Sequence, residues 1–242
     1  MGIILDHVAP WGRSFEDYVA MFALSESDLQ TRILSCADGP AAFNAEMHVR
    51  GRRIVSADPL YTFSPEEIRS RIEAICGTIL QRVRQRQEHF VWDAIRSPEE
   101  LGRVRIAAME TFLDDFARGA REGRYVAAAL PSLPFGRSAF DVALCSHFLF
   151  TYSDLLSAKF HLDTVLEMCR VAGEVRIFPL LDADNTMSRH VDVVRKALTE
   201  RGYAVSIRVV PYMFQVGGNK MMVVNERGQL ATGSRSVSNG CP

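Results

Sequence analysis

The chain has 242 residues, of which 48% are hydrophobic and 24% charged, the balance of a protein that folds around an apolar core. Lysine and arginine together number 28 against 29 aspartates and glutamates, which gives a formal net charge of −1. A protein held to nucleic acid or to an anionic membrane by its overall charge is therefore excluded, because no net basic field is present to neutralise phosphates.

The cysteines and the N-terminus exclude further classes. The five cysteines are odd in number and no two have C-x-x-C spacing, so we expect neither a disulfide framework nor a zinc site, and no metal. The first residues lack the basic and apolar regions of a secretion signal. No run of about 18 apolar residues is present. These observations predict a reduced, cytoplasmic, globular protein with no membrane segment.

The first predicted element is an amphipathic helix over 14–24 that Ser14 caps. Four segments follow it in the order strand, turn, helix, strand: 32–36, 37–40, 41–49 and 53–57. The second strand is closed by Asp58 and Pro59. This succession predicts a βαβ unit.

Two copies of the letters S-P-E-E, at Ser64 and at Ser97, predict the starts of two long helices. Isoleucines at spacings of three and four follow the first copy and make one apolar stripe. We expect a helical insertion over about 62–123, which is longer than a minimal strand-to-strand connection. The insertion either covers a pocket or simply packs on the sheet, and the sequence leaves both open.

Regular alternation of strands and helices resumes after the insertion. Strands are predicted at 125–129, 140–145, 174–178, 204–210 and 220–224, with helices from Ser153 or Asp154 and over 187–201. The two late strands are typical of an antiparallel edge on a parallel sheet. The expected organisation is an N-terminal helical lid (1–29), an α/β Rossmann-like domain (30–225) with a mostly parallel seven-stranded sheet, and a flexible tail (226–242).

Ligands of an open α/β sheet bind at the carboxyl ends of its strands. The turn 37–40 is rich in small residues and opens a helix, so its backbone can approach a ligand closely. Asp58 lies about 20 residues further on, at the end of the second strand, where a carboxylate can accept both hydroxyls of a ribose. A simple turn-forming role before Pro59 is the alternative for Asp58.

Three segments, SCADGPAAF, RIVSADPLY and FDVALCSHFLF, resemble motifs of the class I S-adenosylmethionine (SAM)-dependent methyltransferases, over about residues 30–225. The resemblance implies SAM as cofactor and a site at the ends of the first four strands. The positions that it implies for cofactor binding are Ala37, Asp38, Gly39, Asp58, Pro59, Leu133 and Ser146. Asp58 would bind the ribose, Pro59 and Leu60 would lie beside the adenine, and Leu133 with Pro134 would close on it.

The chain departs from the family pattern in its first loop. Ser35 stands where the family has an acidic residue, and Ala37 and Ala41 replace two glycines. Another group is therefore needed to hold the amino-acid end of the cofactor. Arg13 is the candidate, since a guanidinium binds a carboxylate through two parallel hydrogen bonds. A solvated arginine is the alternative.

The candidates for catalysis are His147, Tyr18 and Tyr152. His147 follows the fourth strand and is either a general base or a packed histidine. A set of aromatic residues is predicted to surround the sulfonium, which aromatic faces attract: Trp11, Tyr18, Tyr61, Phe63, Phe148 and Tyr152. Asn219, in the late hairpin, either reaches the pocket or only makes the turn.

Three functions remain open at this stage. The first is a methyltransferase for a small molecule, with no nucleic-acid or membrane partner and an undetermined oligomeric state. The second is a cyclase that converts SAM alone into azetidine-2-carboxylate and methylthioadenosine, since the segments PWGRSFEDYVAMFAL and CSHFLFTYSD resemble a bacterial branch similar to such enzymes of peptide biosynthesis. The third is a non-catalytic nucleotide-binding protein, which the altered first loop permits.

Overall fold

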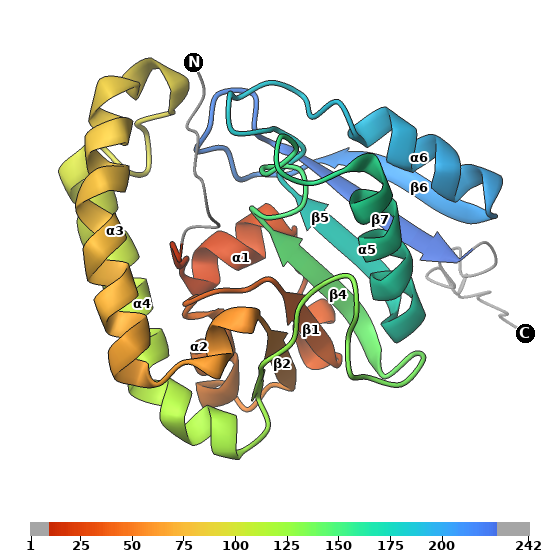
Figure 1. The fold of residues 1–242 in the computed structure, drawn as a ribbon, viewed down its shortest axis with the longest axis horizontal. Helices are drawn as coiled ribbons and strands as arrows, with labels where there is room; N and C mark the ends of the chain where they lie inside the picture. The colour runs from red at the N-terminus through yellow and green to blue at the C-terminus, as the bar shows by residue number, and fades with distance from the viewer. Residues whose placement is uncertain (1–9, 227–242) are drawn as a thin grey trace, which may run out of the picture.

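A seven-stranded sheet runs through the molecule, of which the computed structural model describes residues 10–226 (Figure 1). The strands are β1 Ile33–Cys36, β2 Ile54–Ala57, β3 Tyr125–Val126, β4 Phe140–Ser146, β5 Ala172–Phe178, β6 Tyr203–Val209 and β7 Lys220–Glu226. Their order is β3-β2-β1-β4-β5-β7-β6, with β7 antiparallel to both of its neighbours and the other pairs parallel. This is the strand order of the class I methyltransferase fold, so the predicted fold class is confirmed.

The central strands end at one level, and this determines where a ligand can bind. Cys36 at the end of β1 pairs with Ala57 of β2 on one side and with Cys145 of β4 on the other. The residues of β1 are all buried, as expected for a parallel strand that is covered on both faces. The chain therefore leaves β1, β2 and β4 at the same edge, which is where α/β folds bind their ligands.

The helices are α1 Phe15–Met21, α2 Phe43–Val49, α3 Pro65–Gln85, α4 Pro98–Arg121, α5 Ala158–Val171 and α6 Val191–Glu200. Helices α5 and α6 pack on one face of the sheet, where Ala143 of β4 is buried. Helices α1 and α2 pack on the other face, where Leu144 is buried. Neighbouring residues of one strand thus contribute to two cores, since strand side chains alternate between faces.

The serine caps are confirmed at Ser14, Ser64 and Ser97, each of which accepts a backbone N–H three residues on. The predicted start of α5 is wrong, because Ser157 is its cap. The Ser153 hydroxyl instead donates to the Phe150 carbonyl and lies 2.5 Å from the hydroxyl of Ser188. Residues 153–156 therefore form turns ahead of the helix.

Helices α3 and α4 lie side by side along one flank of the molecule and make up most of the insertion between β2 and β3 (Figure 1). Ile68 and Ile72 of α3 pack with Met109, Phe112 and Phe116 of α4 in a core of their own. The insertion thus has its own apolar core beside the sheet.

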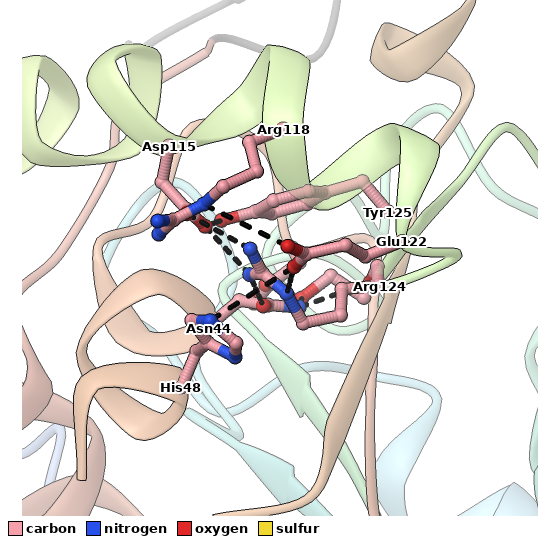
Figure 2. A network of polar contacts seen from close by, with 9 residues as sticks. Asn44, His48, Asp115, Arg118, Glu122, Arg124 and Tyr125 are labelled. Atoms are coloured by element: carbon pink, nitrogen blue, oxygen red, sulfur yellow. Dashed lines mark hydrogen bonds and ion pairs between the residues drawn. The ribbon is translucent and has the colours of Figure 1, made fainter. Parts of the chain in front are cut away.

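A buried polar network joins this insertion to the α/β domain (Figure 2). Both oxygens of Asp115 on α4 accept hydrogen bonds from Arg124, which precedes β3, at 2.6 and 2.8 Å. Arg124 also donates to the Asn44 side chain of α2 at 2.8 Å. Burial opposes ionisation of Asp115, but hydrogen bonds from Arg124 and Arg118 outweigh it and lower its pKa to about 2. The network is therefore a charged link between α4, α2 and β3.

Within residues 10–226, no helix combines the length and the apolar character that crossing a lipid bilayer requires.

Candidate functional site

A cavity of about 690 Å³ opens where β1, β2, β3 and β4 end. The loops after these four strands contribute Ala37 to Pro40, Asp58 to Leu60, Ala128 to Leu130, and Ser146 to Phe148 to its wall. Most of the remaining wall comes from the segment ahead of α1, from α3, and from the loop between β6 and β7, with Tyr18 of α1, Phe63, Thr151 and Tyr152 completing it. The site predicted from the strand ends is thus a real hollow in the molecule.

The loop after β1 turns sharply, because Ala37 and Gly39 both have positive φ, at 51° and 56°. Asp38 lies between them, and its side chain is directed into the protein. Its carboxylate accepts hydrogen bonds from the hydroxyls of Tyr18, Ser35 and Ser56. Burial raises the pKa of Asp38 even though three hydroxyls donate to it. Ser35 is the residue that departs from the family pattern. Its hydroxyl donates to the carboxylate of Asp38, three residues further along the chain.

Asp58 joins the end of β2 to this loop. One carboxylate oxygen accepts the Gly39 N–H at 2.9 Å and the other accepts the Leu60 N–H at 2.7 Å. Burial raises the pKa of Asp58 to about 6. Each oxygen keeps a further lone pair, so the group can also accept hydrogen bonds from two neighbouring hydroxyls of a ligand.

His147 directly follows β4 in a conformation that non-glycine residues seldom adopt, with φ at 48°. Its backbone N–H donates to the Phe178 carbonyl at 2.7 Å, and its Nδ1 lies 3.0 Å from the Ser146 hydroxyl. Burial and then the charges of Arg13 and Arg105 hold the pKa of His147 well below its usual value, so the ring is neutral at pH 7. In the tautomer whose Nδ1–H donates to Ser146, Nε2 is free of hydrogen and can take a proton.

The segment ahead of α1 enters the site through a very narrow space. A Cβ on Gly12 would lie 2.1 Å from the Pro40 carbonyl oxygen and 2.8 Å from the Met109 side chain. The next residue, Arg13, is fixed by its carbonyl, which accepts the Ala42 N–H at 3.0 Å. Only glycine fits at position 12, and this close approach brings Arg13 into the cavity wall.

Arg13 has an N–H group that is available to a ligand. Its Nη1 donates to the Trp11 carbonyl at 3.3 Å, but its Nε is buried without a hydrogen-bond partner within residues 10–226. Burial and the nearby charge of Arg105 lower the pKa of Arg13. Arg105 itself is buried and donates to Asp17 and to the Tyr212 hydroxyl. Two guanidiniums thus face one carboxylate here, and an anionic group beside Arg13 would satisfy both the charge and the free donor.

The structure brings most of the predicted aromatic set together. Trp11, Tyr18, Phe63, Phe148 and Tyr152 all line the cavity, and the Tyr18 hydroxyl is used by Asp38. Tyr61 was also predicted there but is not in the cavity wall. Its hydroxyl donates to the Gly39 carbonyl at 2.8 Å and its ring packs in the core of the insertion. Tyr61 therefore supports the loop from behind.

Two other predicted positions also lie elsewhere. Leu133 is buried in the core against α5, and its N–H donates to the Glu167 side chain at 2.7 Å. Leu130 occupies the cavity wall in its place. Asn219 is not among the lining residues, and its carbonyl accepts the Val210 N–H. Of the other predicted cofactor positions, Ala37, Asp38, Gly39, Asp58, Pro59 and Ser146 all line the cavity.

The individual residues of the outer wall of the cavity were not predicted from the sequence. Ala74, Ile75 and Ile79 of α3 form part of it, together with Phe214 and Gln215. The isoleucines were predicted as one apolar stripe, of which Ile68 and Ile72 pack in the core of the insertion and Ile75 and Ile79 line the cavity. No local signal marks Phe214 and Gln215, because their place depends on contacts with a distant part of the chain.

The described part of the chain, residues 10–226, contains no group of three or more His, Cys, Asp or Glu side chains arranged to hold a metal ion.

Comparison with solved structures gives distant matches. Magnesium protoporphyrin IX methyltransferase from Synechocystis, crystallised with SAM, is 10% identical, with a TM-score of 0.45 over 88% of this chain and 77% of that one. A SAM-dependent methyltransferase from Aquifex aeolicus is 13% identical, with a TM-score of 0.40 over 87% of each chain. At these scores the matches add nothing to the strand order on which the fold assignment rests.

Sequence comparison gives a much nearer relative. No protein-family model matches the chain. The uncharacterized protein MJ0045 of Methanocaldococcus jannaschii is 31% identical over 214 residues, which are 88% of this chain and 94% of that protein. The match extends over almost the whole of both chains. The chain therefore belongs to the family of MJ0045, with the fold of the class I methyltransferases.

Proposed function

We propose that the protein is a SAM-dependent methyltransferase acting on a small molecule. The observation that carries the proposal is the presence, in one cavity at the ends of the parallel strands, of a carboxylate suited to a diol and a guanidinium with an unused donor. Asp58 would accept the ribose hydroxyls of SAM, and Arg13 would bind its carboxylate. The aromatic rings of Trp11, Phe148 and Tyr152 would face the sulfonium.

The adenosine end of the ligand would lie beside β2. Pro59 and Leu60 continue from Asp58 along the cavity wall, and Leu130 follows β3 on the adjacent side. These apolar residues suit the faces of an adenine ring. Leu130 thus takes the role that the sequence resemblance implied for Leu133. The methionine end would lie over the turn 37–39, toward Arg13 and His147.

The neutral His147 would act as general base on the acceptor. A neutral imidazole can receive the proton that a hydroxyl or similar nucleophile loses as it attacks the methyl group. Tyr18 would have a structural role in the cavity wall, since its hydroxyl already donates to Asp38. Methyl transfer also requires in-line placement of the two reactants and exclusion of water, which a cavity covered by α3 and the segment ahead of α1 favours.

Calorimetry and mass spectrometry together test this function. Calorimetry should show binding of SAM and S-adenosylhomocysteine to the wild type, and weaker binding to Asp58→Asn. Incubation of the protein with methyl-labelled SAM and a small-molecule cell extract should move the label to a small product, with S-adenosylhomocysteine as the second product.

Two outcomes would overturn the proposal. Methylthioadenosine and a four-membered imino acid formed from SAM alone would identify the cyclase. Absence of any binding of SAM would identify a protein without this cofactor. His147→Gln, which keeps the size of the side chain but cannot act as a base, should bind SAM normally and lose turnover.

A further inference from the structure

Helix α3 carries one apolar stripe, and only part of it is used to fold the insertion. Ile68, Ile72 and Val83 are buried, the first two against α4. Ile75 and Ile79, four residues apart, are only half-buried and line the cavity instead. A helix at the edge of a domain needs one apolar stripe for packing. The part of the stripe formed by Ile75 and Ile79 therefore supplies an apolar wall to the cavity.

Another part of the cavity wall, at Phe214, is held in place by a joint between distant segments. The Val91 N–H donates to the Phe214 carbonyl at 2.8 Å, and the Val216 N–H donates to the His89 carbonyl at 3.0 Å. The rings of Phe90 and Phe214 stack with their centroids 5.0 Å apart. The loop after α3 is thus fixed to the loop between β6 and β7. Phe214, which lines the cavity, is preorganised by this joint.

Among residues 10–226, the charged side chains that line the cavity beside the apolar wall are arginines. Arg71 and Arg82 lie on α3 at either end of the stripe and both line the cavity, and Arg71 also stacks over Phe63 at 3.6 Å. The carboxylates of the cavity wall are Asp38 and Asp58, which lie at the strand ends and accept hydrogen bonds from protein groups. A cationic group would therefore meet the guanidinium of Arg71 here, which is unfavourable in a partly desolvated site.

We infer that this end of the cavity is the acceptor subsite, with Ile75 and Ile79 as the residues that determine specificity. The acceptor is then a small molecule with an apolar body that is uncharged or anionic, and not a cation. This inference rests on the proposed function for its meaning as an acceptor site. The apolar wall itself is independent of that function and can be tested separately.

Two fluorescent probes with the same ring system provide the test. N-phenyl-1-naphthylamine is neutral, and 8-anilinonaphthalene-1-sulfonate adds one negative charge. Each is titrated into protein saturated with S-adenosylhomocysteine, so that the cofactor region is filled. The variants are Ile75→Asn and Ile79→Asn. The matched control is Ile106→Asn, because Ile106 lies on α4, is 43% exposed and is not among the cavity-lining residues.

Both probes should bind the wild type, the sulfonate at least as tightly as the neutral compound. Each cavity variant should lower probe affinity by roughly tenfold, the expected effect of replacing an apolar contact with an amide, and leave S-adenosylhomocysteine affinity unchanged. The Ile106 variant should behave as the wild type. Probe binding that is absent, or equal in wild type and cavity variants, would overturn the inference, and weaker binding of the sulfonate would overturn its charge selectivity. If probe binding follows this pattern in a protein that does not bind S-adenosylhomocysteine, the apolar site stands and the methyltransferase function fails.

Discussion

Asp58 should make cofactor affinity depend on pH around pH 6. Burial raises the pKa of this carboxyl to about 6 in the free protein. Two ribose hydroxyls can both donate to it only when it is ionised. Bound ligand therefore favours the carboxylate and lowers its pKa, so affinity rises as pH rises through 6 and falls below it.

The size of this effect follows from the pKa. At pH 5, one unit below a pKa of about 6, roughly a tenth of the carboxyl is ionised, so affinity should be about tenfold lower than at pH 8, or about 1.4 kcal/mol. The stability of the unliganded protein depends on pH in the opposite sense. Its raised pKa means that the native state keeps a proton which the unfolded chain releases from about pH 4, so Asp58 makes the fold less stable as pH rises from 4 through 6.

The assay is calorimetric titration with methylthioadenosine between pH 5 and pH 8. This ligand has the ribose and lacks the carboxylate, so Arg13 does not contribute to the pH dependence. Asp58→Asn should bind weakly and with little dependence on pH. A wild-type affinity that stays constant from pH 5 to pH 8 would show that Asp58 does not contact the ribose, and so would an Asp58→Asn protein with the same pH dependence as the wild type.

The other predictions concern the neighbouring residues Gly12 and Arg13 of the segment ahead of α1, and the polar network that links the insertion to the α/β domain. Arg13→Ala should cost about 2–5 kcal/mol of SAM binding, with Arg13→Lys also impaired; calorimetry should show almost no change for methylthioadenosine, and equal losses for both ligands would exclude the carboxylate role. Gly12→Ala should weaken SAM binding and lower the melting temperature, whereas Gly77→Ala, at a helical site where a Cβ meets nothing within 4 Å, should stabilise the protein by about 0.5–1 kcal/mol. Asp115→Asn should cost about 3–5 kcal/mol in urea unfolding, because Arg124 loses its buried partner. Arg118→Gln, which removes a more exposed arginine from the same carboxylate, should cost under about 1 kcal/mol, and similar losses for these two variants would contradict this account.

The sheet could be predicted from the sequence because its strands are short apolar runs separated by clear turns. The long helices could be predicted because S-P-E-E marks their starts. The predicted ends of strands and helices were wrong where the chain has another role. The third strand was expected over 125–129 but pairs only at Tyr125–Val126, since the chain then turns away to form the cavity wall at 128–130.

The inner half of the site could be predicted for the same reason. Residues at the ends of parallel strands share one edge, so Gly39, Asp58 and His147 were brought together by topology alone. The outer half could not. Whether Ile75 contacts α4 or a cavity depends on how α3 lies against α4. The position of Phe214 depends on backbone hydrogen bonds to residues more than a hundred positions away.

The joint between residues 89–91 and 214–216 also links the insertion to the far edge of the sheet. Two backbone hydrogen bonds connect the loop after α3 to the loop between β6 and β7. The insertion is thus attached to the α/β domain at two separate places, through Asp115 and Arg124 at one and through this joint at the other. A disturbance of either attachment should therefore be felt by the cavity wall at Phe214 and Gln215.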